Sequence, residues 1–120
     1  MLYQKLSVLA IGIAMAVTTQ AASFDCAKAS TFVEKEICNN KRLSTLDEVL
    51  ADNYKYMLAA NIGEGAVKDL RQTQKQWLKQ RNSCKTSECI ENAYLARINA
   101  VCDYPVISGV HPACTYADDI

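Results

Sequence analysis

The stretch RNSCKTSECIENAY, residues 81–94, places Cys84 and Cys89 five positions apart, between two segments that both have helical hydrophobic patterns. Zinc sites usually contain close pairs such as C-x2-C and four cysteine or histidine ligands, and redox-active pairs usually form C-x-x-C motifs. The spacing here matches neither motif, and His111 is the chain's single histidine. A disulfide that joins the two segments is therefore favoured, with a metal or redox role as the alternative.

Helical periodicity extends in both directions from this stretch. Residues 66–82 before it, and residues from 87 or 88 to 101 after it, carry apolar residues at three- and four-residue spacings. The expected inner faces are Val67, Leu70, Gln74, Trp77, Leu78 and Arg81 in the first segment, and Ile90, Ala93, Tyr94, Arg97, Ile98 and Val101 in the second. We therefore predict two helices joined at the cysteine pair.

Two further helices are predicted upstream. Thr31 and Glu34 form a capping-box pattern for a short helix over residues 32–39, because a hydroxyl and a carboxylate three residues later can satisfy free backbone donors. The sequence Ser44-Thr-Leu-Asp47 indicates the start of a second helix, with a hydroxyl cap and an acid in the first turn. Its apolar stripe leads to residues 61–65, NIGEG, where a glycine can end the helix. No segment alternates like a strand, so the predicted fold is an all-α, disulfide-stapled bundle of three to four helices.

The first 21 residues have the pattern of a secretory signal peptide. Lys5 precedes an uncharged and mostly apolar run over residues 6–17, and small residues follow it. Cleavage after Ala21 would place Thr19 and Ala21 at the two small-residue positions. A membrane-spanning helix needs about 20 apolar residues, which disfavours the alternative of an uncleaved anchor. We expect a mature protein of roughly 99 residues that is periplasmic and has no membrane anchor after cleavage.

All six cysteines lie after the predicted signal peptide: Cys26, Cys38, Cys84, Cys89, Cys102 and Cys114. An even number in a short exported chain is typical of a disulfide framework. Six cysteines allow 15 pairings, and the sequence alone does not select one of them. Chain geometry favours local closure, which would pair residues 26 with 38, 84 with 89 and 102 with 114.

The segment after the last predicted helix has a different character. Residues 102–120 contain two prolines and a glycine, which argue against a helix across the whole segment. We therefore expect three parts: a signal peptide over residues 1–21, a helical domain over residues 22–101, and an irregular, disulfide-pinned tail over residues 102–120. The 13 basic and 13 acidic residues of the chain are interspersed, which argues against nucleic acid or an anionic membrane as the main partner.

The sequence gives little indication of catalysis. His111 lies in the tail with no recognisable nucleophile motif nearby, so a solvent-exposed histidine is favoured over a member of a catalytic triad. The acids considered for an acid/base pair have helix-start or solvated-face explanations; they are Glu34, Glu36, Asp47, Glu48 and Asp52. We expect no catalytic residue, no metal site and no cofactor.

Gln74, Trp77 and Arg81 share one side of a predicted helix that leads directly to Cys84. One interpretation makes Trp77 an exposed binding anchor. The other makes it a core residue, with Gln74 and Arg81 bonded to neighbouring backbone carbonyls. The apolar Leu70 beside it favours the second interpretation.

Several of these pieces together resemble the LprI-type lysozyme inhibitor domain. They are FDCAKAS at residues 24–30, VEKEIC at 33–38, LSTLD at 43–47, QKQWLKQRNSC at 74–84, Cys89, and AYLAR at 93–97. The resemblance covers about residues 23–98 and implies a small, exported, disulfide-linked helical domain. It also implies a link to lysozyme inhibition, which is attributed to at least one mycobacterial lipoprotein member. This chain lacks the lipoprotein cysteine, and no inhibitory residue is carried over.

Three functions are therefore weighed. The leading hypothesis is a periplasmic protein that binds and inhibits a lysozyme or a related cell-wall-degrading enzyme. The alternative is a non-catalytic envelope-stress or interaction module with another protein partner. An enzyme is the third and least favoured, because only His111 and scattered acids would be at hand for chemistry.

Overall fold

The computed structural model describes residue 12 and residues 22–106 and 111–120. The predicted signal peptide therefore lies outside the described residues apart from Gly12, as do residues 107–110 of the tail. The helical elements in chain order are η1 (Cys26–Lys28), α1 (Phe32–Asn39), α2 (Lys41–Ala59), α3 (Glu64–Asn82), α4 (Ser87–Cys102) and η2 (Ala117–Asp119). The described ranges contain no β-strand, and the prediction of a small all-α bundle is confirmed.

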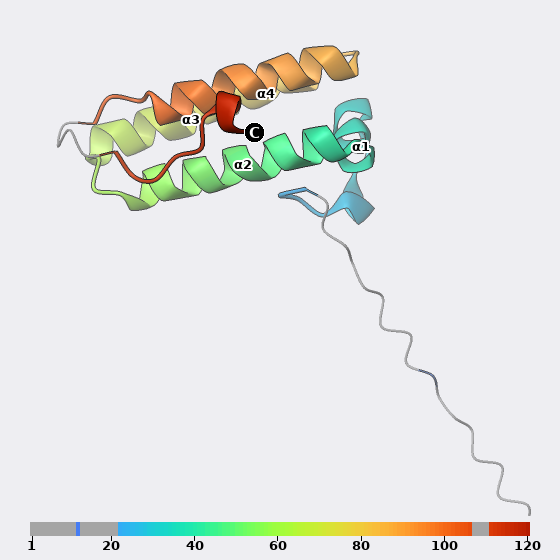
Figure 1. Ribbon diagram of the computed structural model, residues 1–120, viewed down its shortest axis with the longest axis horizontal. Helices are drawn as coiled ribbons and strands as arrows, with labels where there is room; N and C mark the ends of the chain where they lie inside the picture. The colour runs from blue at the N-terminus through green and yellow to red at the C-terminus, as the bar shows by residue number, and fades with distance from the viewer. Residues whose placement is uncertain (1–11, 13–21, 107–110) are drawn as a thin grey trace, which may run out of the picture.

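Helix α4 is the centre of the bundle. It packs against both α2 and α3, whereas α2 and α3 approach each other much less closely. The three long helices run side by side, and the short α1 lies at the far end of α2 from the α2–α3 connection (Figure 1). Most of the predicted inner face of α4 is fully buried, since Ile90, Tyr94, Ile98 and Val101 have no exposed surface. Ala93 and Arg97, which were also assigned to that face, are half-buried.

Helix α2 begins earlier than the sequence analysis predicts. Its cap is Asn40, whose side-chain oxygen accepts a hydrogen bond from the backbone N–H of Leu43. Ser44 lies inside the helix, where it is buried and donates its hydroxyl proton to the backbone carbonyl of Ile37 in α1. The prediction of Ser44 as the cap was wrong because Asn40, an equally good capping residue, stands one turn earlier.

The other helix starts agree more closely with the expectations. Helix α1 has the predicted bounds, and the Thr31 hydroxyl accepts from the backbone N–H of Glu34 at 3.1 Å. Helix α3 starts two residues before the predicted Ala66. Gly63 has a φ of 93°, a conformation that glycine adopts readily, but it begins α3 rather than ending α2.

Three disulfides tie these elements together. They join Cys26 to Cys38, Cys84 to Cys89, and Cys102 to Cys114, which are the pairs that local closure favours. One links η1 to the end of α1, one closes the α3–α4 turn, and one fastens the tail to the end of α4. Both ends of the central helix therefore carry a covalent restraint.

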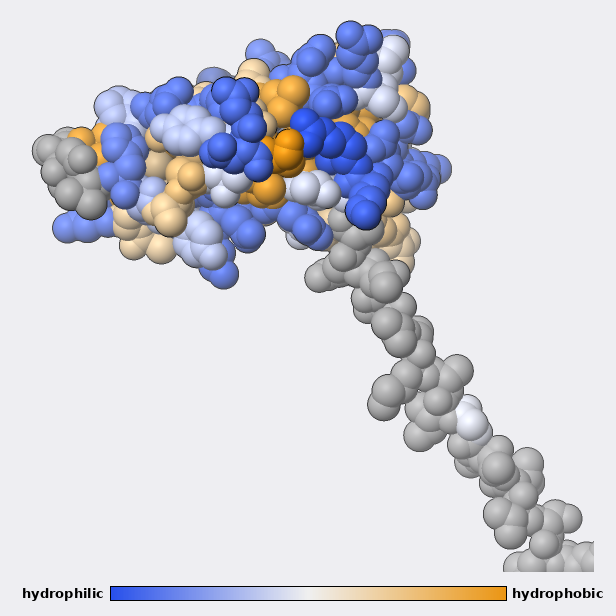
Figure 2. All heavy atoms as spheres, viewed as in Figure 1, coloured by the Kyte–Doolittle hydropathy of each residue, from blue (hydrophilic) through white to orange (hydrophobic). Residues whose placement is uncertain are grey.

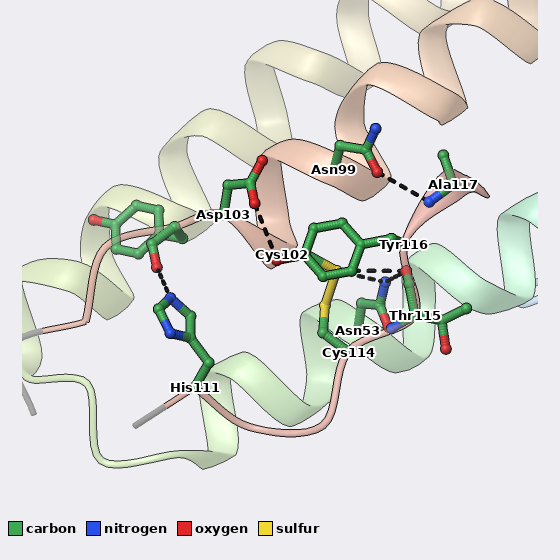
Figure 3. The surroundings of a disulfide bond; sticks show 10 residues. Asn53, Asn99, Cys102, Asp103, His111, Cys114, Thr115, Tyr116 and Ala117 are labelled. Atoms are coloured by element: carbon green, nitrogen blue, oxygen red, sulfur yellow. Dashed lines mark hydrogen bonds between the residues drawn. A yellow bond between two sulfur atoms is a disulfide. The ribbon is translucent and has the colours of Figure 1, made fainter. Parts of the chain in front are cut away.

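The described part of the tail is fastened by more than its disulfide. The side chain of Asn53 in α2 donates to the Thr115 carbonyl at 2.8 Å and accepts from the Thr115 N–H at 3.0 Å (Figure 3). Asn99 of α4 accepts from the N–H of Ala117, at the start of η2. The sequence did not predict η2.

Figure 2 views the bundle from the same side as Figure 1 and shows apolar side chains in the middle of this face, within a mostly hydrophilic surround.

Candidate functional site

A groove lies between α2 and α3, where the two helices are held apart by their common neighbour α4. The hollow has a volume of about 430 Å³. Its side-chain lining comes from α2 (Asp47, Leu50, Ala51 and Tyr54), from α3 (Gln74, Trp77, Leu78 and Arg81) and from Ser23, Phe24 and Glu34 at the N-terminal end. This α2–α3 groove combines apolar walls with a few convergent polar groups, which is the usual composition of a binding site.

Opposite charges meet beneath the groove through a tyrosine hydroxyl. Tyr94 donates to a carboxylate oxygen of Asp47 at 2.7 Å and accepts from a guanidinium nitrogen of Arg81 at 3.0 Å. The second Asp47 oxygen accepts from the backbone N–H of Ser23 at 2.6 Å. Asp47 is only 5% exposed and Arg81 only 8%. Each buried charge is thus hydrogen-bonded, as it must be to avoid a large desolvation cost.

The protonation of Tyr94 supports this arrangement. Burial raises the pKa of the Tyr94 hydroxyl far above its ordinary value of 10.0, and the negative charge of Asp47 raises it further. The phenol therefore keeps the proton that it donates to Asp47. The same hydroxyl oxygen remains an acceptor for Arg81, so one neutral group satisfies both charges.

Trp77 is a core residue, in agreement with the favoured interpretation. It is 7% exposed, and its indole N–H donates to the backbone carbonyl of Ala93 in α4 at 2.9 Å. Its ring meets that of Tyr94 edge to face, with 5.0 Å between the ring centroids, and the Arg81 guanidinium lies 5.7 Å from the indole centroid. Trp77 therefore fastens α3 to α4 and forms one wall of the groove.

Gln74 and Arg81 have other partners than the predicted backbone carbonyls. The Gln74 carbonyl oxygen accepts from the guanidinium of Arg97 in α4 at 2.9 Å. Arg81 bonds to the side chains of Tyr94 and Asn82. Burial lowers the pKa of Arg97, whose side chain extends from α4 to α3.

The remaining candidates for chemistry are dispersed. His111 is exposed and its ring nitrogen donates to the Tyr104 carbonyl at 2.8 Å, as Figure 3 shows. Glu36 accepts from the Ser87 hydroxyl across the α1–α4 contact. Within the described ranges, no group of three or more His, Cys, Asp or Glu side chains is placed to hold a metal ion. The helices of those ranges include none that is both long and apolar enough to cross a membrane.

The buried role of Asp47 and the bridging role of Tyr94 were not predicted from the sequence. A signal for Asp47 was present, because it lies four residues after Leu43 and three before Leu50, on the apolar stripe of α2. An ionisable residue in the middle of a buried stripe indicates a polar network. The partner helix of that network does not follow from the spacing, because it depends on how the bundle closes.

Comparison with known proteins places this chain in a family. The sequence profile described as "Lysozyme inhibitor LprI" matches residues 25–103, which is well over half of the chain. The chain belongs to the LprI family. The LprI match includes all four α-helices and most of the groove, and it ends before Cys114 and η2.

The similar curated proteins are named "Lipoprotein LprI". They come from Mycobacterium bovis and from two strains of Mycobacterium tuberculosis, and each is 26% identical to this chain over 102 residues. The alignments cover 82% of this chain and 50% of each relative, so the chain spans about half the length of the curated LprI proteins that it matches. No solved structure matches this chain.

Proposed function

We propose that this LprI-family protein is exported to the periplasm, where it binds and inhibits a lysozyme or a related cell-wall-degrading enzyme. The observation that carries this proposal is the lysozyme-inhibitor profile, which matches residues 25–103 and hence the whole bundle. Two further observations support export: the relatives are named lipoproteins, and three disulfides are typical of proteins from oxidising compartments. The proposed role is binding rather than catalysis.

A digestion assay tests the inhibition. The full chain is expressed with its own N-terminal segment, purified from the periplasm, and added to bacterial cell walls together with a lysozyme. We expect digestion to slow at near-stoichiometric ratios and a complex to elute earlier than either protein in gel filtration. Absence of both effects with several classes of lysozyme would reject the proposal.

The same preparation tests export and processing. Mass spectrometry is expected to find an N-terminus at Ala22 and no free thiol. Ala22 is buried and the N–H of Ser23 donates to Asp47, so the first residues after the proposed cut already belong to the fold. An intact N-terminal segment, or six reduced cysteines, would contradict this part of the proposal.

The alternative is a non-catalytic envelope-stress or interaction module with a different protein partner. The α2–α3 groove supports this alternative equally well, because its composition does not identify lysozyme as the partner. A pull-down from periplasmic extract separates the two. Reproducible recovery of one dedicated non-lysozyme partner, together with no inhibition, would favour the alternative.

A further inference from the structure

A second hollow is lined by the α2–α3 connection and by one side of α3. It has a volume of about 670 Å³ and begins at the α2–α3 connection. Three cationic side chains line it from α3, Lys68, Arg71 and Lys75, and all three are exposed. Among the residues that the structure describes, none supplies a hydrogen bond or an ion pair to these three side chains. We call Lys68, Arg71 and Lys75 the α3 cationic face.

The spacing of these residues makes a straight row of charge. Lys68 and Arg71 are three residues apart and Arg71 and Lys75 four, which corresponds to axial separations of about 4.5 and about 6 Å at 1.5 Å per residue. The row is therefore about 10 Å long and runs along one side of the helix. Glu64, one turn before Lys68, also lines the hollow, and the local charge remains positive.

The floor of the hollow is apolar. Ala60, Ile62 and Val67 contribute to it from the α2–α3 connection and the first turn of α3. Lysine and arginine stems can extend this apolar surface while their charged ends reach outward. A surface of this kind suits a protein partner that presents carboxylates beside an apolar edge, since Arg71 can pair with a carboxylate through two parallel hydrogen bonds.

The proposed target class carries a pair of carboxylates in its catalytic cleft. Glycoside hydrolases that cleave cell-wall glycans use two Asp or Glu side chains, about 5 to 5.5 Å apart in retaining enzymes and about 6.5 to 9.5 Å apart in inverting ones. The axial separations within the α3 cationic face, about 4.5 and about 6 Å between neighbours and about 10 Å from end to end, lie on either side of these distances, and the flexible stems let the charged ends adjust to them. We infer that the α3 cationic face meets the catalytic carboxylates of the inhibited enzyme, an inference that rests on the proposed function. The apolar floor formed by Ala60, Ile62 and Val67 would then receive an edge of the enzyme's cleft.

Charge reversal of the face tests this inference. The triple variant Lys68→Glu, Arg71→Glu and Lys75→Glu changes only exposed side chains that hold no other element in place. The matched control reverses three exposed lysines elsewhere, Lys35→Glu, Lys55→Glu and Lys85→Glu, and alters the net charge equally. Circular dichroism and the midpoint of thermal unfolding confirm that both variants fold like the wild type.

The readouts are the inhibition constant in the digestion assay and the dissociation constant for the same lysozyme. We expect the α3 variant to bind at least about tenfold more weakly, because like charges would then oppose each other across the contact, whereas the control should stay within about threefold of the wild type. A lysozyme whose two catalytic carboxylates are replaced by amides should also bind the wild type more weakly, and it should no longer distinguish the wild type from the α3 variant.

The outcomes separate the two proposals. Wild-type inhibition with an unaffected α3 variant would overturn this inference and leave the proposed function standing. Equal losses in the α3 variant and the control would also overturn it, because they would indicate a general effect of net charge. Failure of the wild type itself to bind any lysozyme would reject the proposed function and this inference with it.

Discussion

Replacing Tyr94 by Phe should destabilise the protein strongly although it removes a single oxygen atom. The ring would stay in place, including its edge-to-face contact with Trp77. The lost atom, however, holds two hydrogen bonds to charged groups, one to Asp47 at 2.7 Å and one from Arg81 at 3.0 Å. Both charges are more than nine-tenths buried, so water does not readily replace the hydroxyl.

The size of the effect follows from these contacts. A hydrogen bond to a charged group contributes about 1.5–3 kcal/mol, and each charge here keeps other partners, so we expect a loss of about 3 kcal/mol in the free energy of unfolding. For a domain of about 100 residues, this lowers the midpoint of thermal unfolding by roughly 12 °C or more.

The assay is urea unfolding followed by the fluorescence of Trp77, the single tryptophan of the chain. Tyr56→Phe provides the matched control, because Tyr56 is 51% exposed and should change the unfolding free energy by less than about 0.5 kcal/mol. If Tyr94→Phe differed from the wild type by no more than the control does, the bridge between Asp47 and Arg81 would have no energetic role, and the reasoning would be refuted.

Three further outcomes are expected. Because burial raises the pKa of Tyr94, the unfolded chain binds fewer protons than the folded one above about pH 10. The free energy of unfolding should therefore fall as the pH rises through that range, and it should fall less in Tyr94→Phe. Parallel curves of unfolding free energy against pH for the two proteins from pH 8 to 11 would contradict this. Replacing Cys84 and Cys89 together by Ser should cost about 2 kcal/mol in urea unfolding while the helical circular dichroism is retained, and an unchanged midpoint would count against a stapling role. Asn53→Ala should speed protease cleavage and amide exchange at Thr115 before the helices are affected, whereas unchanged exchange there would show that the disulfide alone holds the tail.

The helices were predictable because their signals are local. Apolar residues at three- and four-residue spacings indicated α3 and α4, and Thr31 identified the start of α1. Local competition caused the error at α2, where Asn40 and Ser44 are both suitable caps. Asn40 caps the backbone N–H of Leu43, whereas the Ser44 hydroxyl bonds to α1 instead. The disulfide pairs were favoured for the same reason, since each closes a short loop next to a helix end.

The groove was less predictable because its parts come from distant segments. Asp47 and Tyr94 belong to different helices and meet only when α2 packs on α4, and Arg81 joins them from a third helix. The α3 cationic face is different. Its spacing can be read from the sequence, but its exposure, its freedom from intramolecular partners and its position beside a hollow follow only from the packing of α3.

The disulfides and the buried network affect binding because they keep α3 rigid. The α3 cationic face consists of long, flexible side chains, and their ordering on association already has a cost. Ordering three long side chains on association costs about 0.5–1.5 kcal/mol each, so the interface starts with an unfavourable contribution of about 1.5–4.5 kcal/mol before any backbone is ordered. The backbone of α3 adds little to this cost, because Trp77 fastens it to the Ala93 carbonyl, Gln74 to Arg97, and Cys84 to Cys89 at the start of α4. The residues that the sequence singled out as a motif thus act at a distance from the proposed contact: they hold still the helix that presents the charges.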